Sequence, residues 1–463
     1  MNIAMLSAFI LYFCTLIGIA LYFYKKNSSA QNFMLGDRSV NYWVTAIATQ
    51  ATDMGSWLFM GLPAAVYISG LFEAWTAIGL VIGMFLTWHF IAPKLRIDTG
   101  SRESVTLPSY FAHRFGDTSG ALQFTGAFFC LFFSIPYIAS GVVGLSLLFE
   151  STLGISHQLG IALSLSTAVL YTLIGGFVAI AWCDMFQGIF LLCMILLVPI
   201  YAFIHIPNGI ADIFSAAQAG NKTLSLISSP ADTISAILLA AGWGLGYFGQ
   251  PHILMNFMGI DDPQKIKYAK WVGITWQILV LTSSVSVGLM GIGFFGNTLN
   301  NPQLVFIRLV TELFHPFCAG FILCAILAAT LSTIDSLILG SGATIATDLY
   351  KTFINPAASS DQTLRISRIG SLLVSGLALY IAWENTLSIH NLVNYAWAGL
   401  GSSFGPLVIL SLYSKNTTKT GALTGMIAGG LTSALWPYAV PLVPGFCIGM
   451  ATIYCVSLLS RPS

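Results

Sequence analysis

The residue in this chain that most needs a chemical reason is Asp53. It lies in the segment Ala51-Thr-Asp-Met-Gly-Ser-Trp57, within an otherwise apolar run from about Val44 to Val66. An aspartate at the centre of a membrane helix costs roughly 2.5 to 3.5 kcal/mol on insertion scales, so such a residue predicts a functional site and a partner for its charge. The partner that suits a carboxylate is a cation. Gly55 favours a break in the helix at the same place.

A second group of oxygen-bearing residues lies far along the chain, in Ala329-Thr-Leu-Ser-Thr-Ile-Asp-Ser336. Ala329, Ser332, Thr333 and Ser336 are spaced i, i+3, i+4 and i+7, so they share one face of a helix, with Asp335 beside that face. A single Ser or Thr in a membrane helix usually bonds to the carbonyl four residues before it. Several hydroxyls with a carboxylate instead predict a site for a cation such as Na⁺, which prefers hard oxygen ligands. A buried, hydrogen-bonded carboxyl is the alternative for Asp335.

The run Gly242-Trp-Gly-Leu-Gly-Tyr-Phe-Gly-Gln-Pro251 has four glycines in its first eight residues. Its spacing matches the dinucleotide fingerprint, but that motif requires a preceding strand, a crossover helix and a distant acid. Gly401-Ser-Ser-Phe-Gly405 similarly matches G-x-S-x-G without the strand and the His-Asp pair of a nucleophile elbow. Neither motif therefore predicts an enzyme. The glycine run predicts an unwound helix, which at membrane depth is tolerated only where it is buried or lines a cavity.

The elements that must position these residues are membrane helices. The chain has 463 residues, of which 56% are hydrophobic and 8% charged, with a mean hydropathy of +0.82; soluble domains average about 25% charged residues. Apolar windows near 20 residues, the length that crosses roughly 30 Å of hydrocarbon, predict about thirteen spans. These are expected at about 3–24, 44–66, 74–91, 121–149, 159–178, 185–205, 233–254, 271–295, 317–346, 369–383, 392–412, 422–439 and 444–459. The eight cysteines are scattered through them without a C-x-x-C pair, so we expect packing residues rather than disulfides or a zinc site.

The basic residues predict the orientation of the chain. With Met1 placed outside and the spans threaded in turn, sixteen of the 18 Lys and Arg residues fall on the inner side. The inner residues are Lys25, Lys26, Arg38, Lys94, Arg96, Arg102, Arg114, Lys265, Lys267, Lys270, Lys351, Arg365, Arg368, Lys415, Lys419 and Arg461. Only Lys222 and Arg308 fall outside. This positive-inside asymmetry predicts an external N-terminus and a cytoplasmic C-terminus.

Three further residues stand out, and each has an ordinary structural interpretation. Arg38, just before the span that carries Asp53, is either an anchor at the lipid headgroups or a residue for gating or coupling. Tyr137 follows Pro136 in the fourth span, where the helix can bend, and is either a substrate contact or a buried aromatic. Asp184 lies at the predicted edge of the sixth span, where a solvated interfacial carboxylate is the ordinary explanation.

The two predicted helix breaks fall at comparable places, in the second and seventh spans. Interrupted helices at corresponding positions of two halves indicate the midplane site of a transporter built from inverted repeats. The freed helix ends would supply carbonyls for Na⁺ and N–H groups for a substrate carboxylate. We therefore expect one all-α transporter domain over 1–463. Its parts would be a first helix and loop (1–40), two repeats of five spans (41–206 and 233–413) and two C-terminal helices (420–463).

Several short motifs together resemble those of the sodium:solute symporter family. They are Leu35-Gly-Asp-Arg-Ser39, Asp53-Met54 with Trp57, Trp243-Gly-Leu-Gly-Tyr-Phe-Gly-Gln-Pro-His252, Ser332-Thr333, Asp348-Leu-Tyr-Lys351 and Tyr395-Ala-Trp-Ala-Gly399. The resemblance extends from Phe33 to about Leu459, and the decapeptide ending at His252 is typical of the proline branch. It implies a LeuT-type 5+5 inverted-repeat fold in a bacterial inner membrane. It also implies Na⁺ as the coupling ion for uptake of a small zwitterion, L-proline.

The resemblance further implies roles for individual residues. The Na⁺ site would be formed by Ala51, Met54, Ala329, Ser332 and Thr333. Asp53 would support that site electrostatically. The substrate would lie against Gly55, Ser56, Trp57, Tyr137, Trp243, Tyr247 and Pro251. Arg38 and Asp184 match positions tied to sodium coupling, and Asp184, Asp335 and Ser336 are the positions of a possible second cation site.

Two features depart from the proline branch. That branch has the order Asp-Met-Ser-Gly-Trp, whereas this chain reads Asp53-Met-Gly-Ser-Trp57, which moves the serine by one position. This leaves another small amino acid, or a carboxylate, open as the substrate; a transporter-like membrane sensor is a further alternative. Asp335 stands where the branch usually has a neutral residue, which indicates a second cation or a proton. The expected partners are the solute, Na⁺ and membrane lipid, with no nucleic acid.

Overall fold

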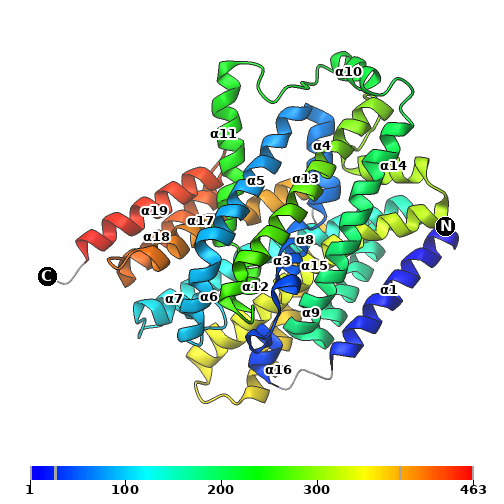
Figure 1. Ribbon diagram of the computed structural model, residues 1–463. Coiled ribbons are helices and arrows are strands. Elements are labelled where there is room, and N and C mark those ends of the chain that lie inside the picture. Colours follow the sequence, from blue (N-terminus) through cyan, green and yellow to red (C-terminus); the bar gives the residue numbers. More distant parts are fainter. Residues whose placement is uncertain (1–2, 25–28, 385–387, 439, 461–463) are drawn as a thin grey trace.

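The computed structural model describes residues 3–24, 29–384, 388–438 and 440–460. The chain is helical throughout these ranges, which contain no β-strand; two isolated bridges pair Val40 with Ile260 and Gly70 with Thr223. Figure 1 shows the helices packed side by side in one bundle, with the last two helices at one flank and the first at the opposite flank. The predicted inner charges at 25, 26 and 461 lie outside the described residues.

Most of the long helices are continuous. They are α1 (Ile3–Tyr24), α8 (Ala121–Leu153), α13 (Ile266–Phe295), α16 (Ser360–Glu384), α17 (Ile389–Tyr413), α18 (Lys419–Leu435) and α19 (Leu442–Leu459). The longest, α9 (His157–Ile204), is divided by a turn at Gly176. Two others contain a π-helical segment: α5 (Ala74–Leu86) continues through η3 (Thr87–Ile91) into α6 (Ala92–Ser101), and α15 (Pro316–Thr344) continues into η7 (Ile345–Ile354). Segments expected as loops contain the shorter helices α2 (Ala30–Leu35), α7 (Leu107–Phe115), α10 (Ile210–Ala219) and α14 (Val305–Leu313).

Eleven of the thirteen predicted spans each correspond to a helix or to a pair of half-helices, and the fifth and sixth correspond to the two halves of α9. Among the described residues, eight helices are long and apolar enough to cross a membrane on their own, and three shorter apolar helices accompany them. The predicted polytopic architecture is therefore present.

The boundary between the fifth and sixth spans was predicted wrongly. The chain does not leave the helix near Asp184; α9 turns at Gly176, whose φ of 65° and ψ of 177° are accessible to glycine and strained for other residues. The second half of α9 thus begins about ten residues earlier than expected. Asp184 consequently lies inside the helix and is buried, not solvated at an interface.

Both predicted helix breaks are present. The second span consists of α3 (Tyr42–Met54) and α4 (Trp57–Ser69), separated by Gly55 and Ser56. The seventh consists of α11 (Pro230–Gly244), a 3₁₀ turn η4 (Leu245–Gly249) and α12 (Pro251–Met258). Gly55 has a φ of 37°, and a Cβ there would lie 3.3 Å from the Thr333 hydroxyl. A larger residue at position 55 would therefore be strained and crowded.

Glycines also let α5 approach α11 closely. A Cβ on Gly79 or Gly83 would overlap the backbone of Ala240 or Gly244, so the two helices meet at backbone distance. Such small-residue contacts are the usual way in which membrane helices pack tightly. The contact fixes the end of α11 immediately before the break, and hence the position of Trp243.

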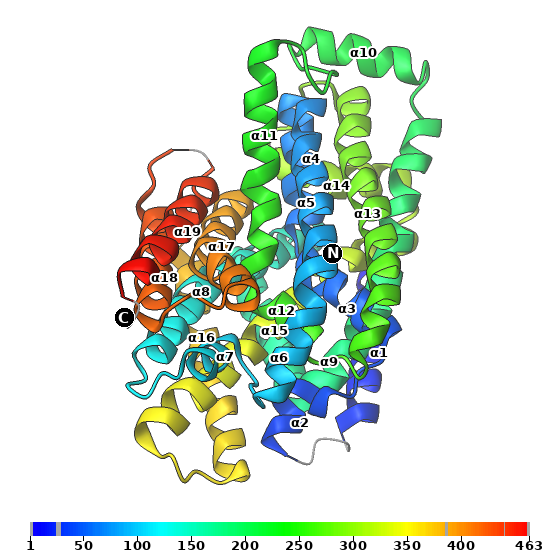
Figure 2. The same cartoon turned by 60° about the vertical axis from the view of Figure 1, so that its left-hand side comes forward.

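The two ends of the bundle differ in charge. The helices α2, α6 and α7 lie at one end and α10 at the other (Figure 2). Lys94, Arg102 and Arg114 belong to α6, α7 and the turn between them, whereas Lys222 follows α10. The basic residues of α6, α7 and the turn between them therefore lie at the opposite end of the bundle from Lys222. Which end faces the cytoplasm stays a prediction.

Candidate functional site

The break between α3 and α4 is held against α15 by a backbone hydrogen bond. The Gly55 N–H donates to Thr333 Oγ1 at 2.9 Å, and the same hydroxyl donates to the Ala329 carbonyl at 3.1 Å. One side chain of α15 therefore satisfies a group that the break leaves free. Ala51, Met54 and Ser332 are buried in the same region, and Ser332 Oγ has no hydrogen-bond partner among the described residues. Of the predicted Na⁺ ligands, the structure brings Thr333 and Ala329 into contact beside the break.

A second cluster of oxygens lies between α3, α9 and α15. Thr52 Oγ1 donates to Asp184 Oδ2 at 3.1 Å and lies 3.3 Å from Ser336 Oγ. The Asp335 carboxylate is fully buried, and neither of its oxygens has a donor within the part of the chain that the structure describes; Asp184 Oδ1 also lacks one. Buried carboxylates are ordinarily paired or hydrogen-bonded. The unpartnered oxygens of Asp184 and Asp335 are the donor set that a hard cation prefers.

Asp53 is turned away from both oxygen clusters. Its Oδ2 accepts a short hydrogen bond from the Tyr247 hydroxyl, which in turn accepts one from Gln277 Nε2 at 2.9 Å. All three side chains are fully buried. Asp53 therefore connects α3 to the second broken helix and to α13, and it is no direct part of the oxygen cluster around Thr333.

Aromatic rings line the space between the two breaks. Trp57 and Trp243 stack with ring centroids 5.7 Å apart, and His390 lies 5.5 Å from Trp243. Trp397 Nε1 donates to the Trp243 carbonyl at 2.9 Å, and the Tyr247 ring meets Trp397 edge to face at 5.0 Å. The indole of Trp397 thus satisfies a carbonyl beside the unwound turn, as irregular backbone at membrane depth requires.

Tyr137 packs against the start of α12. Its ring meets that of His252 edge to face at 5.5 Å, and Pro251 begins α12 next to it. The Tyr137 hydroxyl and both ring nitrogens of His252 are buried and have no partner among the described residues. These free polar groups are suited to contact a solute.

Ser56 does not face the oxygen clusters. It is buried against α8, where a Cβ added to Gly144 would lie 2.6 Å from the Ser56 Cβ. The shifted order of Gly55 and Ser56 therefore puts the glycine against α15 and the serine against α8.

Arg38 is no headgroup anchor. Its guanidinium donates to the carbonyls of Met258 (2.7 Å), Thr99 (2.9 Å) and Ser104 (2.8 Å). It therefore ties the segment before α3 to the ends of α6 and α12. Burial, with a smaller contribution from the nearby charge of Arg96, lowers the pKa of Arg38 to about 10. The guanidinium remains charged at neutral pH.

Sequence reasoning missed several residues of this region. Thr52 and Asn256 link the Asp184 cluster to α12, since Asn256 Nδ2 lies 3.4 Å from Thr52 Oγ1. Gln277 and His252 were also not selected. A buried amide or imidazole in an apolar span was the available signal for both, but no local pattern identifies the partner of either.

Residues 33–429 match the sodium:solute symporter family. The chain belongs to this family. It is 40% identical to the high-affinity proline transporter PutP of Bacillus subtilis, over 96% of this chain and 95% of the relative. It is 37% identical to the sodium/proline symporter of Escherichia coli, over 99% and 93% of the two chains. The protein is accordingly a multi-pass membrane transporter and not an enzyme.

Two solved structures show the same fold. A Na⁺-coupled sialic acid symporter in a substrate-bound outward-open state superposes with a TM-score of 0.85 at 18% identity, covering 100% of this chain and 99% of that one. MhsT in complex with L-phenylalanine gives a TM-score of 0.58 at 14% identity, covering 91% and 99%. The predicted LeuT-type fold is confirmed.

The hydrogen bond between Asp53 and Tyr247 predicts that substitutions of the two residues have coupled effects on stability. Tyr247→Phe leaves a buried carboxylate oxygen without its donor, so we expect the free energy of unfolding to fall by about 1 to 3 kcal/mol. In the Asp53→Asn background we expect Tyr247→Phe to lower the free energy of unfolding by less. The coupling energy between the two substitutions should be at least about 0.5 kcal/mol. Unfolding of the purified protein in detergent measures both. Tyr395→Phe, at a half-buried tyrosine of α17, is the control, and strictly additive effects of the pair would contradict the bond.

Proposed function

We propose that this protein is a Na⁺-coupled symporter that carries L-proline into the cell. The observation that carries the proposal is the placement of unpartnered, buried oxygens directly beside an aromatic-lined region at two broken helices. The names of the full-length relatives, proline transporters and sodium/proline symporters, support the choice of solute. Membership of the sodium:solute symporter family supports coupling to sodium.

The proposed Na⁺ site lies between α3 and α15. Its ligands are the backbone oxygens of Ala51, Met54 and Ala329 and the hydroxyls of Ser332 and Thr333. Thr333 Oγ1 donates its hydrogen to the Ala329 carbonyl. A bound cation draws the same oxygens together and so bridges the broken helix to α15. Sodium thereby favours one arrangement of α3 against α15, which is the requirement for an ion to shift a conformational equilibrium.

The proposed solute site lies against Trp57, Trp243, Tyr137 and Pro251. Aromatic faces suit the ring of proline, and the N-terminus of α4 offers backbone N–H groups and the positive end of a helix dipole to the carboxylate. Tyr247 reaches the site with its ring, because its hydroxyl is bonded to Asp53. Gly55 and Ser56 shape the turn that exposes those N–H groups.

The ion supplies the driving force. Moving one charge through 100 mV is worth about 2.3 kcal/mol, so one Na⁺ at such a potential drives more than tenfold accumulation of the solute. We propose that the end of the bundle with α6 and α7 faces the cytoplasm, in a bacterial inner membrane, with the N-terminus outside and the C-terminus inside. The repeats of the fold are proposed to span 41–206 and 233–413.

A second solute class remains a specific candidate. Because Ser56 packs on α8, the serine hydroxyl is not positioned beside Thr333 as an extra polar group at the break. Another small amino acid, or a small carboxylate, would use the same helix N-terminus.

Uptake into proteoliposomes tests the function. We expect uptake of labelled L-proline that requires an inward Na⁺ gradient and is abolished by unlabelled L-proline. Liposomes without protein are the control. A panel of unlabelled amino acids and carboxylates tests the second candidate, and uptake indifferent to unlabelled proline would refute the proline proposal.

The proposed Na⁺ site predicts a selective change in sodium dependence. Ser332→Ala with Thr333→Ala removes two ligands, so we expect the Na⁺ concentration for half-maximal uptake to rise at least about tenfold, while the amount of protein in the membrane stays similar. The matched control is Thr330→Ala. Thr330 is equally buried on α15 but donates only to its own helix, at 2.6 Å to the Ile326 carbonyl. An equal effect of the control would refute the assignment.

We further propose that Asp335, with Asp184 and Ser336, binds a second cation. Asp335→Asn keeps the shape of the side chain and removes its charge, so the number of Na⁺ ions moved per solute should fall by one. Reversal potentials of solute flux in proteoliposomes measure this ratio. Asp361→Asn, at an exposed carboxylate of α16, is the control. A ratio unchanged by Asp335→Asn would make Asp335 a structural residue.

A further inference from the structure

Asp348 is a buried carboxylate that the proposed transport cycle leaves unused. It lies in η7, the π-helical continuation of α15, and is fully buried. Its Oδ1 accepts hydrogen bonds from Thr106 Oγ1 at 2.9 Å and from Gln123 Nε2 at 3.0 Å. Its Oδ2 has no donor among the described residues. One carboxylate oxygen therefore joins three separate elements, and the other is left unsatisfied.

The partners of Asp348 hold the start of α7 and of α8. Thr106 is the N-cap of α7, where its hydroxyl and that of Ser109 form a capping box with the backbone. Gln123 lies in the first turn of α8. The bonds to Asp348 thus fix both helix starts against the end of α15. Without them, α7 keeps its cap but loses its attachment to α15.

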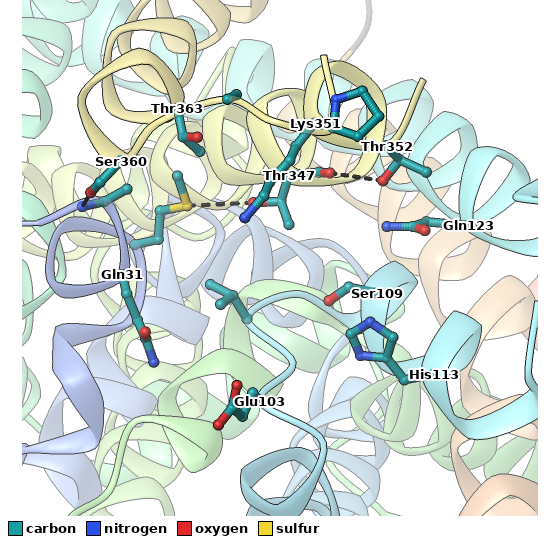
Figure 3. Close-up of a pocket in the computed structure, with 15 residues that line it drawn as sticks. Gln31, Glu103, Ser109, His113, Gln123, Thr347, Lys351, Thr352, Ser360 and Thr363 are labelled. Atoms are coloured by element: carbon teal, nitrogen blue, oxygen red, sulfur yellow. Dashed lines mark hydrogen bonds between the residues drawn. The ribbon is translucent and has the colours of Figure 1, made fainter. Parts of the chain in front are cut away.

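A cavity of ≈ 520 Å³ opens on one side of this cluster. Figure 3 shows Gln123 and Ser109 on one side of it and Gln31 and Ser360 on the opposite side, with Lys351 between them. The cavity lies at the end of the bundle that carries α2 and α7. We propose above that this end faces the cytoplasm.

A much smaller gap lies on the other side of the cluster. It has a volume of ≈ 10 Å³ and is lined by Thr106, Ser134, His252, Ser341 and Thr344, among others. His252 and Pro251 also belong to the region around Tyr137 where the solute is proposed to bind. Thr106, one partner of Asp348, lines this gap, and Gln123, the other partner, lines the large cavity, so the cluster lies between the two spaces.

We propose that the hydrogen bonds of Asp348 to Thr106 and Gln123 form the inner gate on the release route of the solute. The route runs from His252 through the small gap between α8 and α15 to the ≈ 520 Å³ cavity. This inference rests on the transport function proposed above but not on the identity of the solute.

The chemistry of Asp348 suits a gate that opens to water. In the closed arrangement Oδ2 is buried without a donor, which is unfavourable for a carboxylate. When α7 moves away from α15, water reaches both oxygens and replaces the two lost hydrogen bonds. The hydrogen bonds that hold the closed state can therefore be replaced by hydrogen bonds from water.

A cysteine already present reports on the route. Cys130 of α8 lines the small gap, with Sγ 3.9 Å from Thr344 Oγ1. Cys324 of α15 is equally buried but points toward α1, with Sγ 3.9 Å from the Ala8 carbonyl. Two full-length proteins, each retaining only one of these cysteines, provide the probe and its matched control. Both are labelled with a membrane-impermeant maleimide in inside-out membrane vesicles.

We expect Asp348→Leu and Gln123→Leu each to raise the labelling rate of Cys130 at least fivefold, and the double variant to add little to either. Asp348→Asn keeps an oxygen that accepts both bonds, so its labelling rate should stay within twofold of the parent. Cys324 should remain unlabelled in all variants, which excludes general unfolding. An unchanged Cys130 rate in Asp348→Leu, or equal rates for the Leu and Asn variants, would overturn the gate.

The same vesicles separate this inference from the proposed function. Solute and Na⁺ are absent from the labelling assay, so its outcome does not depend on which solute is carried. Failure of proline uptake with intact, Asp348-dependent labelling would refute the substrate and leave the gate. Normal proline uptake, with a Cys130 labelling rate that does not change in the Asp348 variants, would support the substrate and refute the gate.

Discussion

The structure depends on one constraint: a helix that stops in the middle of a membrane must have its freed backbone groups satisfied by protein. At the first break this is done by Thr333, whose hydroxyl accepts the Gly55 N–H while it donates to Ala329. At the second it is done by Trp397 and Gln250, whose side chains donate to the carbonyls of Trp243 and Gly246. Elements distant in sequence must therefore lie at the breaks, and this brings α15 and α17 to the centre of the bundle.

The same constraint explains how one helix serves two different chemistries. Successive residues of an α-helix are rotated by about 100°, so Thr52 and Asp53 point to different neighbours. Thr52 faces Asp184 and Ser336, whereas Asp53 faces Tyr247. The oxygen clusters and the aromatic-lined region are consequently placed on separate sides of α3, only one residue apart. A displacement of α3 must alter both sides together, which is the physical basis that coupling of an ion to a solute requires.

Sequence patterns predicted what depends on local chemistry. The glycines at 55 and in 242–249 marked both helix breaks, and the i, i+3, i+4 spacing put Ser332 and Thr333 on one face. They did not predict what depends on distant packing. The depth of Asp184 follows from the turn at Gly176, and a glycine pair within an apolar run does not by itself distinguish a turn from close packing. The Asp53–Tyr247 bond joins residues 194 apart, and no local pattern specifies it.

Arg38, which is partly buried, and Asp348, which is fully buried, lie at the same end of the bundle and show how rigid and movable contacts can be distinguished. Arg38 donates to carbonyls at the ends of α6 and α12, where helix dipoles favour a cation, so the charge stabilises a group of elements that can move as a unit. Its bonds need not break when that unit shifts. Asp348 instead bonds to side chains on α7 and α8, and it retains an oxygen with no donor among the described residues. A guanidinium bonded to several backbone carbonyls suits a permanent joint, whereas a carboxylate with a donor-free oxygen suits a contact that opens, because that oxygen gains donors when water enters.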